Sequence, residues 1–463
     1  MQKLFDEVGS LDKRCYEKFA LTEDILMEHA SNGIASYIRK KFKKGSKVII
    51  ASGSRNNGAD GLACARLLHG DYDVNIFYVK APSSDMALLQ EKRIKALKVK
   101  TTLELKDCDV LVDAVVGTGF RGEFSDELKV LMQKLNSIKA FKIACDIPSG
   151  IKKNGECAEG SFIADVTLTM GALKKGMFLD EAKEFTGKIK VLNLGVSRDN
   201  YETDSNWNLL DMSDLTLPFR DKKNLHKGDF GHLAVACGDK SGASKMSALS
   251  ALRFGCGLVT LIGFKDEIVP NDLMYAHELP QNTTAFALGM GLGDGFSDLE
   301  LDRFLDNKLP LIVDADIFSK DIILKILKRK NIVLTPHPKE FVSLLKLTNI
   351  ADISVKKLQK NRFKYVEKFC ALFPDATLVL KGANVIIAQN KNFFINPHGD
   401  AKLAKGGSGD ILSGLIGSLV AQNYSPLDSA KNASLAHTKL AKLYKGANFS
   451  LTPSDLIKQI SNL

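Results

Sequence analysis

The chain has 463 residues, of which 45% are hydrophobic and 25% are charged, and its formal net charge is +10. This length exceeds one ordinary hydrophobic core, so we expect about two or three globular domains. The basic residues are scattered along the chain, which argues against a nucleic-acid-binding arm. We find no long uncharged apolar run and no start typical of a signal peptide. The sequence therefore predicts a cytoplasmic protein that binds neither nucleic acid nor a membrane.

Cysteine and histidine residues are spaced too widely to indicate a metal site. The eight cysteines occur singly, without a C-x-x-C pair, and the eight histidines show no spacing typical of zinc ligands. We interpret the cysteines as small buried hydrophobic residues in a reducing compartment.

The first half has the pattern of a Rossmann-like unit. Residues 5–39 have helical spacing, and residues 47–51 form a short apolar run typical of a buried strand. A turn rich in glycine and asparagine follows, and helical spacing returns over residues 62–68. The turn lacks GxGxxG, and no Gly-Lys-Ser/Thr follows it, so a dehydrogenase fingerprint and a P-loop are both poorly supported. Further strands are predicted over residues 74–79, 110–115 and 142–145, with helices over 86–97 and 126–135.

Three polar residues lie near the ends of predicted strands. Asn57 follows the first strand, Asp113 lies within the strand over residues 110–115, and Ser149 follows the strand over residues 142–145. The carboxyl ends of parallel strands meet at one edge of a sheet, so these residues can converge on one crevice. Their oxygen atoms are ligands that suit a hard cation. Each turn alone is more typical of an ordinary strand end whose Asp or Asn caps a helix, but the three together favour a site.

These segments resemble the signature of the NAD(P)HX epimerases, which act on hydrated NADH and NADPH, over about residues 1–200. The matching stretches are Asn56-Asn57-Gly58-Ala59-Asp60-Gly61, Val112-Asp113-Ala114 with Gly117-Thr118-Gly119, and Asp146-Ile147-Pro148-Ser149-Gly150. The resemblance implies that a potassium ion (K+) is held by Asn57, Asp113 and Ser149. It also implies dinucleotide contacts from Asn56, Asn57, Gly58, Ala59, Asp60, Gly117, Thr118, Gly119, Phe120, Arg121, Gly122, Glu123 and Asp146. Ala59 replaces a glycine usual in the family, and Ser54-Arg55 replace the more common Pro-Gly.

The second half begins after a predicted linker. Residues 197–224 show no clear period and hold the only tryptophan, so we place the linker there and expect domains over residues 1–205 and 222–463. Strands are predicted over residues 233–237, 258–262, 285–288, 310–313, 332–334 and 377–380. Helical stretches lie between most of them, which indicates a second α/β layer structure.

A glycine-rich loop near the C-terminus is typical of a phosphate-binding site. The stretch Gly406-Gly407-Ser408-Gly409-Asp410 leaves backbone N–H groups free and opens onto an apolar helix. A carboxylate does not bind an anion, so we interpret Asp410 as a base that takes a proton from a hydroxyl attacking phosphorus. Taken alone, the loop is explained about equally well as a glycine-rich turn with an Asp near a helix start.

Two further candidates lie at predicted strand ends. His337 stands between two prolines in a rigid, exposed turn, an unusual place for a core histidine, although such turns also simply end strands. Lys381 would reach nucleotide phosphates, and the alternative is a solvated lysine at a turn.

With the terminal loop, these segments resemble the ribokinase-like fold and, more narrowly, ADP/ATP-dependent NAD(P)HX dehydratase, over roughly residues 222–463. The shared features are His226-Lys227-Gly228, Gly242-Ala243, Thr335-Pro336-His337-Pro338 with Glu340, Lys381-Gly382-Ala383 and Gly406-Gly407-Ser408-Gly409-Asp410. The resemblance implies that the hydrated nicotinamide nucleotide meets Ala243, Gly293, His337 and Asp410. It implies that the adenine nucleotide, bound with Mg2+, meets Lys381, Gly382, Ala383, Asn384, Val385 and Gly409. Val385 stands where the family usually has threonine.

The two resemblances together predict an α/β protein of two domains, an N-terminal Rossmann-like three-layer domain and a C-terminal ribokinase-like domain. They imply an enzyme, expected to be a homo-oligomer, whose substrates are NADHX, NADPHX and ADP or ATP. The first domain would interconvert the R and S epimers, and the second would dehydrate the S form, releasing AMP or ADP and phosphate. The alternative is a ribokinase-like vitamin-precursor kinase whose N-terminal domain is a binding scaffold.

Overall fold

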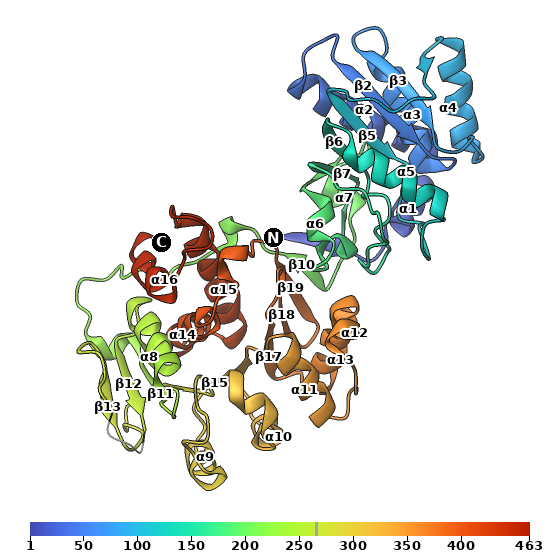
Figure 1. Ribbon diagram of the computed structural model, residues 1–463. Coiled ribbons are helices and arrows are strands. Elements are labelled where there is room, and N and C mark those ends of the chain that lie inside the picture. The colour runs from blue at the N-terminus through green and yellow to red at the C-terminus, as the bar shows by residue number, and fades with distance from the viewer. Residues whose placement is uncertain (264–266) are drawn as a thin grey trace. The chain divides into compact units, whose positions relative to one another are not determined.

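The structure is a computed structural model that describes residues 1–263 and 267–463 (Figure 1). Its contacts divide the chain into two compact units. The N-terminal unit is Lys3–Ser205, and the C-terminal unit is Asn206–Leu463 together with Met1–Gln2. No helix among the described residues combines the length and the apolar composition that crossing a membrane requires.

The N-terminal unit is built on a seven-stranded parallel sheet with the order β4-β3-β2-β5-β6-β7-β9. The strands of this sheet are β2 (Lys47–Ser52), β3 (Asp73–Tyr78), β4 (Lys100–Thr101), β5 (Val110–Ala114), β6 (Phe141–Cys145), β7 (Val166–Met170) and β9 (Lys188–Leu192). Outside it, β1 (Gln2–Phe5) pairs in parallel with β8 (Leu173–Lys174). The helices are α1 (Gly9–Phe19), α2 (Glu23–Lys41), α3 (Asn56–Leu68), α4 (Asp85–Ala96), α5 (Asp126–Ser137), α6 (Lys183–Thr186) and α7 (Arg198–Tyr201).

Both faces of this sheet are covered by helices. Val48 and Ile50 of β2 belong to one buried cluster with apolar residues of α2, α3 and α4. Ile49 and Ala51, which alternate with them along the strand, belong to a second cluster with apolar residues of α5. Burial on both faces explains why the strand has an uninterrupted apolar sequence. The predicted three-layer, Rossmann-like arrangement is confirmed.

The C-terminal unit contains a larger sheet with the order β13-β12-β11-β14-β15-β16-β17-β18-β19-β10. Neighbouring strands are parallel except at β17–β18 and β18–β19, which are antiparallel. The strands are β10 (Trp207–Leu209), β11 (His232–Ala236), β12 (Leu258–Ile262), β13 (Met274–Ala276), β14 (Ala285–Leu288), β15 (Leu311–Val313), β16 (Ile332–Leu334), β17 (Ala376–Leu380), β18 (Val385–Gln389) and β19 (Asn392–Asn396). The helices are α8 (Ser241–Arg253), α9 (Asp298–Leu305), α10 (Ile322–Ile326), α11 (Pro338–Leu347), α12 (Val355–Lys360), α13 (Arg362–Leu372), α14 (Ser408–Ala421), α15 (Pro426–Leu443) and α16 (Pro453–Gln459).

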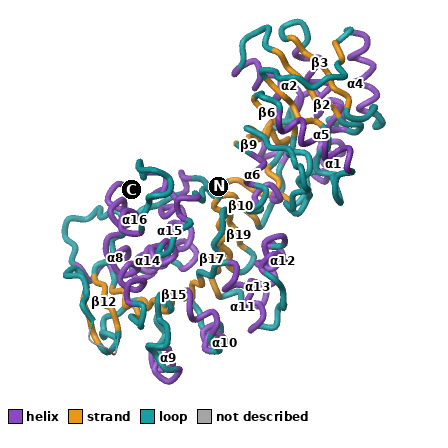
Figure 2. The backbone as a smooth tube through the Cα atoms, viewed as in Figure 1, coloured by secondary structure: helices purple, strands orange, loops and turns teal. Residues whose placement is uncertain are grey.

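Helices again form a layer on each side of the strands (Figure 2). On one side, apolar residues of α8, α14, α15 and α16 share a buried cluster with Leu233 and Val235 of β11. On the other side, the ring of Phe286 in β14 packs against Phe304 of α9, with centroids 5.5 Å apart. The predicted α/β class is therefore confirmed in both units.

The segment that we assigned to the linker is more ordered than its sequence suggests, since it contains α7 and β10. Trp207 of β10 is only 6% exposed and stacks on Phe393 of β19 at a centroid distance of 4.7 Å. Its Nε1 donates a hydrogen bond of 2.8 Å to Oε1 of Glu367. The tryptophan therefore belongs to the packing of the C-terminal unit and not to a free linker. A three-residue strand is too short to show a period in the sequence.

Candidate active sites

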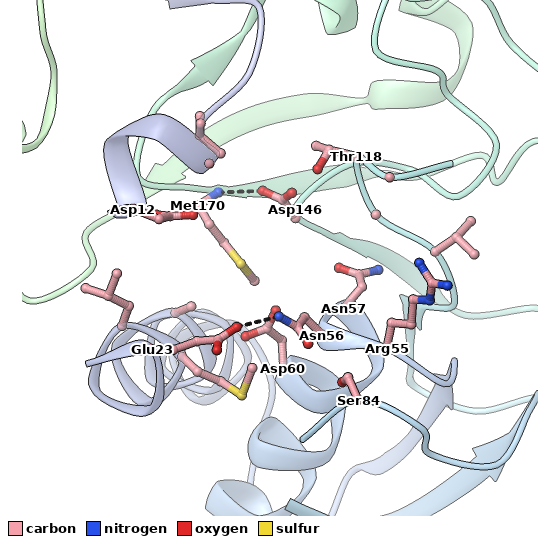
Figure 3. Close-up of a pocket in the computed structure, with 18 of the residues that line it drawn as sticks. Asp12, Glu23, Arg55, Asn56, Asn57, Asp60, Ser84, Thr118, Asp146 and Met170 are labelled. Atoms are coloured by element: carbon pink, nitrogen blue, oxygen red, sulfur yellow. Dashed lines mark hydrogen bonds between the residues drawn. The ribbon is translucent and has the colours of Figure 1, made fainter. Parts of the chain in front are cut away.

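The N-terminal unit holds a pocket of about 960 Å3 beside the loops that follow β2, β5 and β6 (Figure 3). Among the residues predicted to contact the dinucleotide, those that line this pocket are Asn56, Asn57, Asp60, Gly117, Thr118, Gly119, Phe120, Arg121 and Asp146. The other four, Gly58, Ala59, Gly122 and Glu123, do not line it. The structure thus brings together three loops that are far apart in the sequence.

The turn from β2 into α3 depends on two glycines. A Cβ on Gly53 would lie 1.8 Å from the carbonyl oxygen of Val115, and a Cβ on Gly58 would lie 2.0 Å from the carbonyl oxygen of Gly53. Only glycine allows such close backbone approaches, and they bring the start of α3 against the end of β5. As a result Asn56, the first residue of α3, lies in the pocket, where its Nδ2 donates to Oε1 of Glu23 at 2.5 Å.

Asp113 and Ser149, both predicted K+ ligands, are in direct contact. The Ser149 hydroxyl donates to Oδ1 of Asp113 at 2.6 Å, and the Ser149 backbone N–H donates to Oδ2 at 2.8 Å. Burial raises the pKa of Asp113 to about 6, although these hydrogen bonds favour the charged form. The third predicted ligand, Asn57, packs 3.4 Å from the position that a Cβ on Gly117 would take. Its buried Nδ2 has no hydrogen-bond partner within the described structure.

Asp146 is held by a lysine that the sequence analysis missed. The Nζ of Lys174 lies 2.6 Å from Oδ1 of Asp146, and the backbone N–H of Met170 donates to the same oxygen at 3.0 Å. The side chain of Lys174 is only 4% exposed. Asp146 has φ of 69°, in the left-handed region that a non-glycine residue occupies only under strain, and such strain is common at functional sites. A lysine within an apolar stretch at residues 172–174 was the only available signal.

Asp113 and Ser149 do not line the pocket, but two carboxylates that do line it also have raised pKa values. Burial raises the pKa of Asp60 well above its ordinary value, and the charge of Asp146 adds to the effect. Burial also raises the pKa of Asp12, which accepts a hydrogen bond of 2.7 Å from the hydroxyl of Tyr201. Groups with pKa values raised toward neutrality are suited to acid–base chemistry, so the pocket is equipped for proton transfer.

In the C-terminal unit, the predicted base Asp410 is the third residue of α14. Gly407 precedes the helix with φ of 88°, and a Cβ there would lie 2.6 Å from Cγ of Pro453. No hydrogen bond joins the Asp410 carboxylate to the helix backbone within the part of the chain that the structure describes, so it does not act as a helix cap. Burial raises its pKa to about 6, and the neighbouring charge of Asp314 contributes. The carboxylate is therefore largely ionised at neutral pH and still basic enough to accept a proton.

A buried ion pair lies next to the start of α14. The Nζ of Lys381 lies 2.8 Å from Oδ1 of Asp314, while the hydroxyl of Ser413 donates to Oδ2 of the same carboxylate at 2.7 Å. A Cβ on Gly409 would lie 3.3 Å from Nζ of Lys381, so glycine leaves room for the ammonium group beside the helix. The alternative interpretation of Lys381, a solvated lysine at a turn, therefore does not hold. The residues after it, 382–384, form the turn between β17 and β18, and Val385 is the first residue of β18.

His337 is exposed, as predicted, but its ring caps a helix. Its Nδ1 accepts hydrogen bonds from the backbone N–H groups of Lys339 (3.1 Å) and Glu340 (3.3 Å) at the start of α11. An accepting Nδ1 requires the proton on Nε2, which lies 3.2 Å from Oε1 of Glu340. Burial, followed by the charge of Lys381, lowers the pKa of His337, which agrees with a neutral ring. The sequence signal for this arrangement was the spacing of His337 and Glu340 around a proline.

The two remaining predicted substrate contacts lie on adjoining elements. Ala243 is in the first turn of α8, and its Cβ lies 3.0 Å from the position of a Cβ on Gly291. Gly293 has φ of 58°, and its N–H donates to Oδ2 of Asp316 at 2.8 Å.

Comparisons with known proteins assign both units. Residues 23–176 match the family model described as the YjeF-related protein N-terminus, and residues 233–462 match the model of NAD(P)H-hydrate dehydratase. The chain is 44% identical over 474 residues to the bifunctional NAD(P)H-hydrate repair enzyme of Helicobacter pylori, covering 100% of both chains. This chain belongs to the bifunctional NAD(P)H-hydrate repair enzyme family.

A second curated relative agrees with this assignment, and a solved structure is also similar to part of the chain. The repair enzyme of Dictyoglomus turgidum is 32% identical over 502 residues, which cover 98% of this chain and 96% of that one. A solved ADP/ATP-dependent NAD(P)H-hydrate dehydratase from Bacillus subtilis, co-crystallized with ATP/Mg2+, is 28% identical over 53% of this chain and 94% of its own, with a TM-score of 0.46. Membership of the repair family confirms the resemblance of both halves and favours the repair enzyme over a vitamin-precursor kinase.

Proposed function

We propose that this chain repairs hydrated NADH and NADPH by two reactions in two separate sites. The N-terminal unit interconverts the R and S epimers of the hydrate. The C-terminal unit uses ADP or ATP to dehydrate the S epimer, releasing AMP or ADP and phosphate. Family membership supports both activities, and the observation that carries the second is the half-buried carboxylate of Asp410, with its pKa raised to about 6, at the start of α14.

Asp410 acts as the base in the C-terminal site. It takes the proton from the hydroxyl of the S epimer, and that oxygen forms a bond to the terminal phosphorus while the bond from phosphorus to the rest of the nucleotide breaks. Phosphate then leaves with its electron pair, a proton leaves the neighbouring ring carbon, and the double bond is restored. Hydroxide is a poor leaving group at neutral pH and phosphate is a good one, which is the chemical reason for using a nucleotide.

The surroundings of Asp410 bind and orient the two substrates. Lys381 and Gly409, with Gly382, Ala383, Asn384 and Val385, contact the adenine nucleotide. Ala243, Gly293 and His337 contact the hydrated nucleotide. Mg2+ would accompany the adenine nucleotide and neutralise charge on its phosphates. No group of three or more His, Cys, Asp or Glu side chains among the described residues is placed to hold a metal.

The N-terminal pocket binds the hydrate through the loops that contain Asn56–Asp60 and Gly117–Glu123, together with Asp146. Asn57, Asp113 and Ser149 would hold K+, whose positive charge would lie beside the bound substrate. All three offer oxygen atoms, which suits this hard cation, and the contact between Asp113 and Ser149 supports the assignment. The raised pKa values of Asp12 and Asp60 supply groups that can exchange protons with the substrate.

The proposal is tested with the full chain, hydrated NADPH and ADP, by following recovery of the absorbance of the reduced nicotinamide. We expect recovery that requires ADP or ATP and is lost in Asp410→Asn. Recovery without any nucleotide would contradict the proposed chemistry. We further propose that the protein is cytoplasmic, consistent with eight cysteines that are all free. We also propose that it is a homo-oligomer, and light scattering of the purified protein tests this oligomeric state.

A further inference from the structure

Three positively charged side chains line the N-terminal pocket, those of Arg55, Lys80 and Arg121, and no residue of the described structure forms an ion pair with Arg55 or Lys80. Arg55 immediately precedes α3, and Lys80 lies in the loop after β3. Both side chains are exposed.

The loops that contain these two cations are tied to each other. The carbonyl oxygen of Ser54 accepts hydrogen bonds from the backbone N–H of Ser83 at 2.7 Å, from the Ser83 hydroxyl at 3.1 Å and from the backbone N–H of Ser84 at 3.3 Å. Ser54 adjoins Arg55, and Ser83 follows Lys80 by three residues. The shared hydrogen bonds therefore hold both cations at the same side of the pocket.

Carboxylates also line the pocket, those of Asp12, Glu23, Asp60 and Asp146. Figure 3 places Arg55 and Ser84 on one side of the pocket and Asp12 and Glu23 on the other. A dinucleotide bound here would have its phosphates repelled by these carboxylates and attracted to Arg55 and Lys80. The remaining cation of the lining, Arg121, lies in the loop after β5.

The position of Lys80 favours one phosphate of the substrate. In dinucleotide-binding Rossmann units, the ribose of the adenosine lies beyond the strand that follows the first glycine-rich turn and helix. The turn here lacks GxGxxG, so the comparison rests on the shared strand order, in which β3 follows that turn and helix and pairs with β2. An acidic residue at that place binds the free 2′-hydroxyl, whereas a basic residue accommodates a 2′-phosphate. Here that strand is β3, and the stretch from Val79 to Ser84 contains Lys80 and no Asp or Glu.

We propose that Lys80 and Arg55 form a subsite for the 2′-phosphate, so that the N-terminal unit acts more efficiently on hydrated NADPH than on hydrated NADH. This inference rests on the proposed epimerase function of the pocket. Lys80 contacts the 2′-phosphate as a point charge, and Arg55 adds planar donors beside it. The unphosphorylated hydrate leaves both cations in water at no cost, so it remains a substrate.

The test uses the full chain and the variants Lys80→Ala and Arg55→Ala, with Lys92→Ala as the control. Lys92 is exposed on α4 outside the pocket, so its removal makes the same charge change nearby. Formation of the S epimer from the pure R epimer is followed by chromatography without ADP, for both hydrates. In parallel, NADP+ and NAD+ are titrated calorimetrically into each protein.

We expect Lys80→Ala to lower kcat/KM for hydrated NADPH and the affinity for NADP+ by about tenfold, the size of one lost charge-assisted hydrogen bond. Arg55→Ala should act in the same direction, and Lys92→Ala should change neither value. Values for hydrated NADH and NAD+ should hardly move. An equal loss for both hydrates would overturn the proposal, because the cations would then bind a phosphate that both substrates share. No loss for either hydrate would also overturn it, because the cations would then be merely solvated.

The calorimetric measurement separates this inference from the proposed function. If the wild-type chain epimerises neither hydrate, the epimerase assignment fails. A preference for NADP+ over NAD+ that Lys80→Ala abolishes would still establish the subsite in that case. If the wild-type chain epimerises both hydrates while Lys80→Ala leaves the preference unchanged, the subsite alone is wrong.

Discussion

In the C-terminal unit, the ammonium group of Lys381 is paired with the carboxylate of Asp314 at 2.8 Å, and the Asp314 side chain is only 2% exposed. Burial acts to lower the pKa of Lys381, but the charges of Asp314 and Glu340 outweigh it, so the pKa is raised and the amine stays charged. A fixed positive charge is thereby held next to Gly409, where the proposed site meets the nucleotide phosphates.

This pairing predicts an unequal response to the loss of two lysines. Lys381→Met leaves the buried carboxylate of Asp314 without its counter-ion, which we expect to lower the free energy of unfolding by about 3 kcal/mol. Lys325→Met removes an exposed partner of Asp302, and such pairs contribute at most about 1 kcal/mol. Urea unfolding of both variants measures the difference. Equal losses in the free energy of unfolding would show that the buried pair stabilises the protein no more than the exposed pair does. Nucleotide affinity should fall only in Lys381→Met.

Removing the base should abolish catalysis without removing the nucleotide site. Asp410→Asn keeps the size of the side chain but cannot accept the proton, so we expect dehydration to slow by about 10²–10⁴-fold. Calorimetry should show that ADP still binds. Asp302→Asn, on the distant helix α9, serves as the control and should retain the wild-type rate. Turnover of the Asp410→Asn variant at the wild-type rate would show that another group is the base.

The raised pKa of Asp410 predicts where activity is lost in acid. The ionised carboxylate is the reactive form, so raising its pKa to about 6 moves the loss of base toward neutral pH. We expect kcat/KM for dehydration to fall below pH 6, by about tenfold for each pH unit, and to level off above pH 7. An ordinary Asp would show this fall only near about pH 4. The protein must remain folded over this pH range. A value of kcat/KM that then stays constant down to pH 5 would contradict the assignment.

The K+ assignment predicts an effect confined to one of the two reactions. Asn57→Ala and Asp113→Ala each remove an oxygen ligand, so they should weaken K+ binding and slow epimerisation, while dehydration of the pure S epimer continues. Titrating K+ against the epimerisation rate measures the first effect. Asn154→Ala is a suitable control, because within the described residues the exposed Asn154 side chain forms hydrogen bonds only with neighbouring Glu156. If both site variants match the wild type with and without K+, the ion is wrongly placed.

Strongly apolar stretches made the layers predictable. The twelve residues from Lys47 to Gly58 show the pattern: a run buried on both faces, followed by a turn whose glycines permit the approach of α3. Every strand that we predicted is present within one residue of its expected ends. The strands that were missed are β1, β4, β7, β8 and β9 in the N-terminal half, and β10, β13 and the hairpin β18–β19 in the C-terminal half. Most of their sequences are too short or too mixed for a period of two to stand out.

Contacts between distant segments lay beyond the sequence. Nothing in the sequence near Asp146 indicates that it pairs with Lys174, 28 positions later. This contact depends on the path of the chain through β7 and β8, which brings Lys174 back to Asp146. In the same way, Ser413 reaches Asp314 across 99 positions. His337 was recognised as exposed, but its role as a cap required the geometry of α11. Residue types at strand ends could be predicted, and the partners that set their charge states could not.

The central claim, that epimerisation and dehydration are carried out by different units, is tested most directly by a time course of NAD(P)H recovery from a mixed pool of epimers with ADP. A protein consisting of residues 206–463 should fold alone, because this range keeps β10 and Trp207 and so contains the core of the C-terminal unit. Its site holds one hydroxyl in line with a phosphate, and such geometry cannot serve both configurations equally. We therefore predict that it converts the S fraction quickly and then slows to the uncatalysed rate of epimerisation, whereas the full chain runs to completion in one fast phase. Complete single-phase conversion by residues 206–463 alone would contradict the assignment of the epimerase to the N-terminal unit.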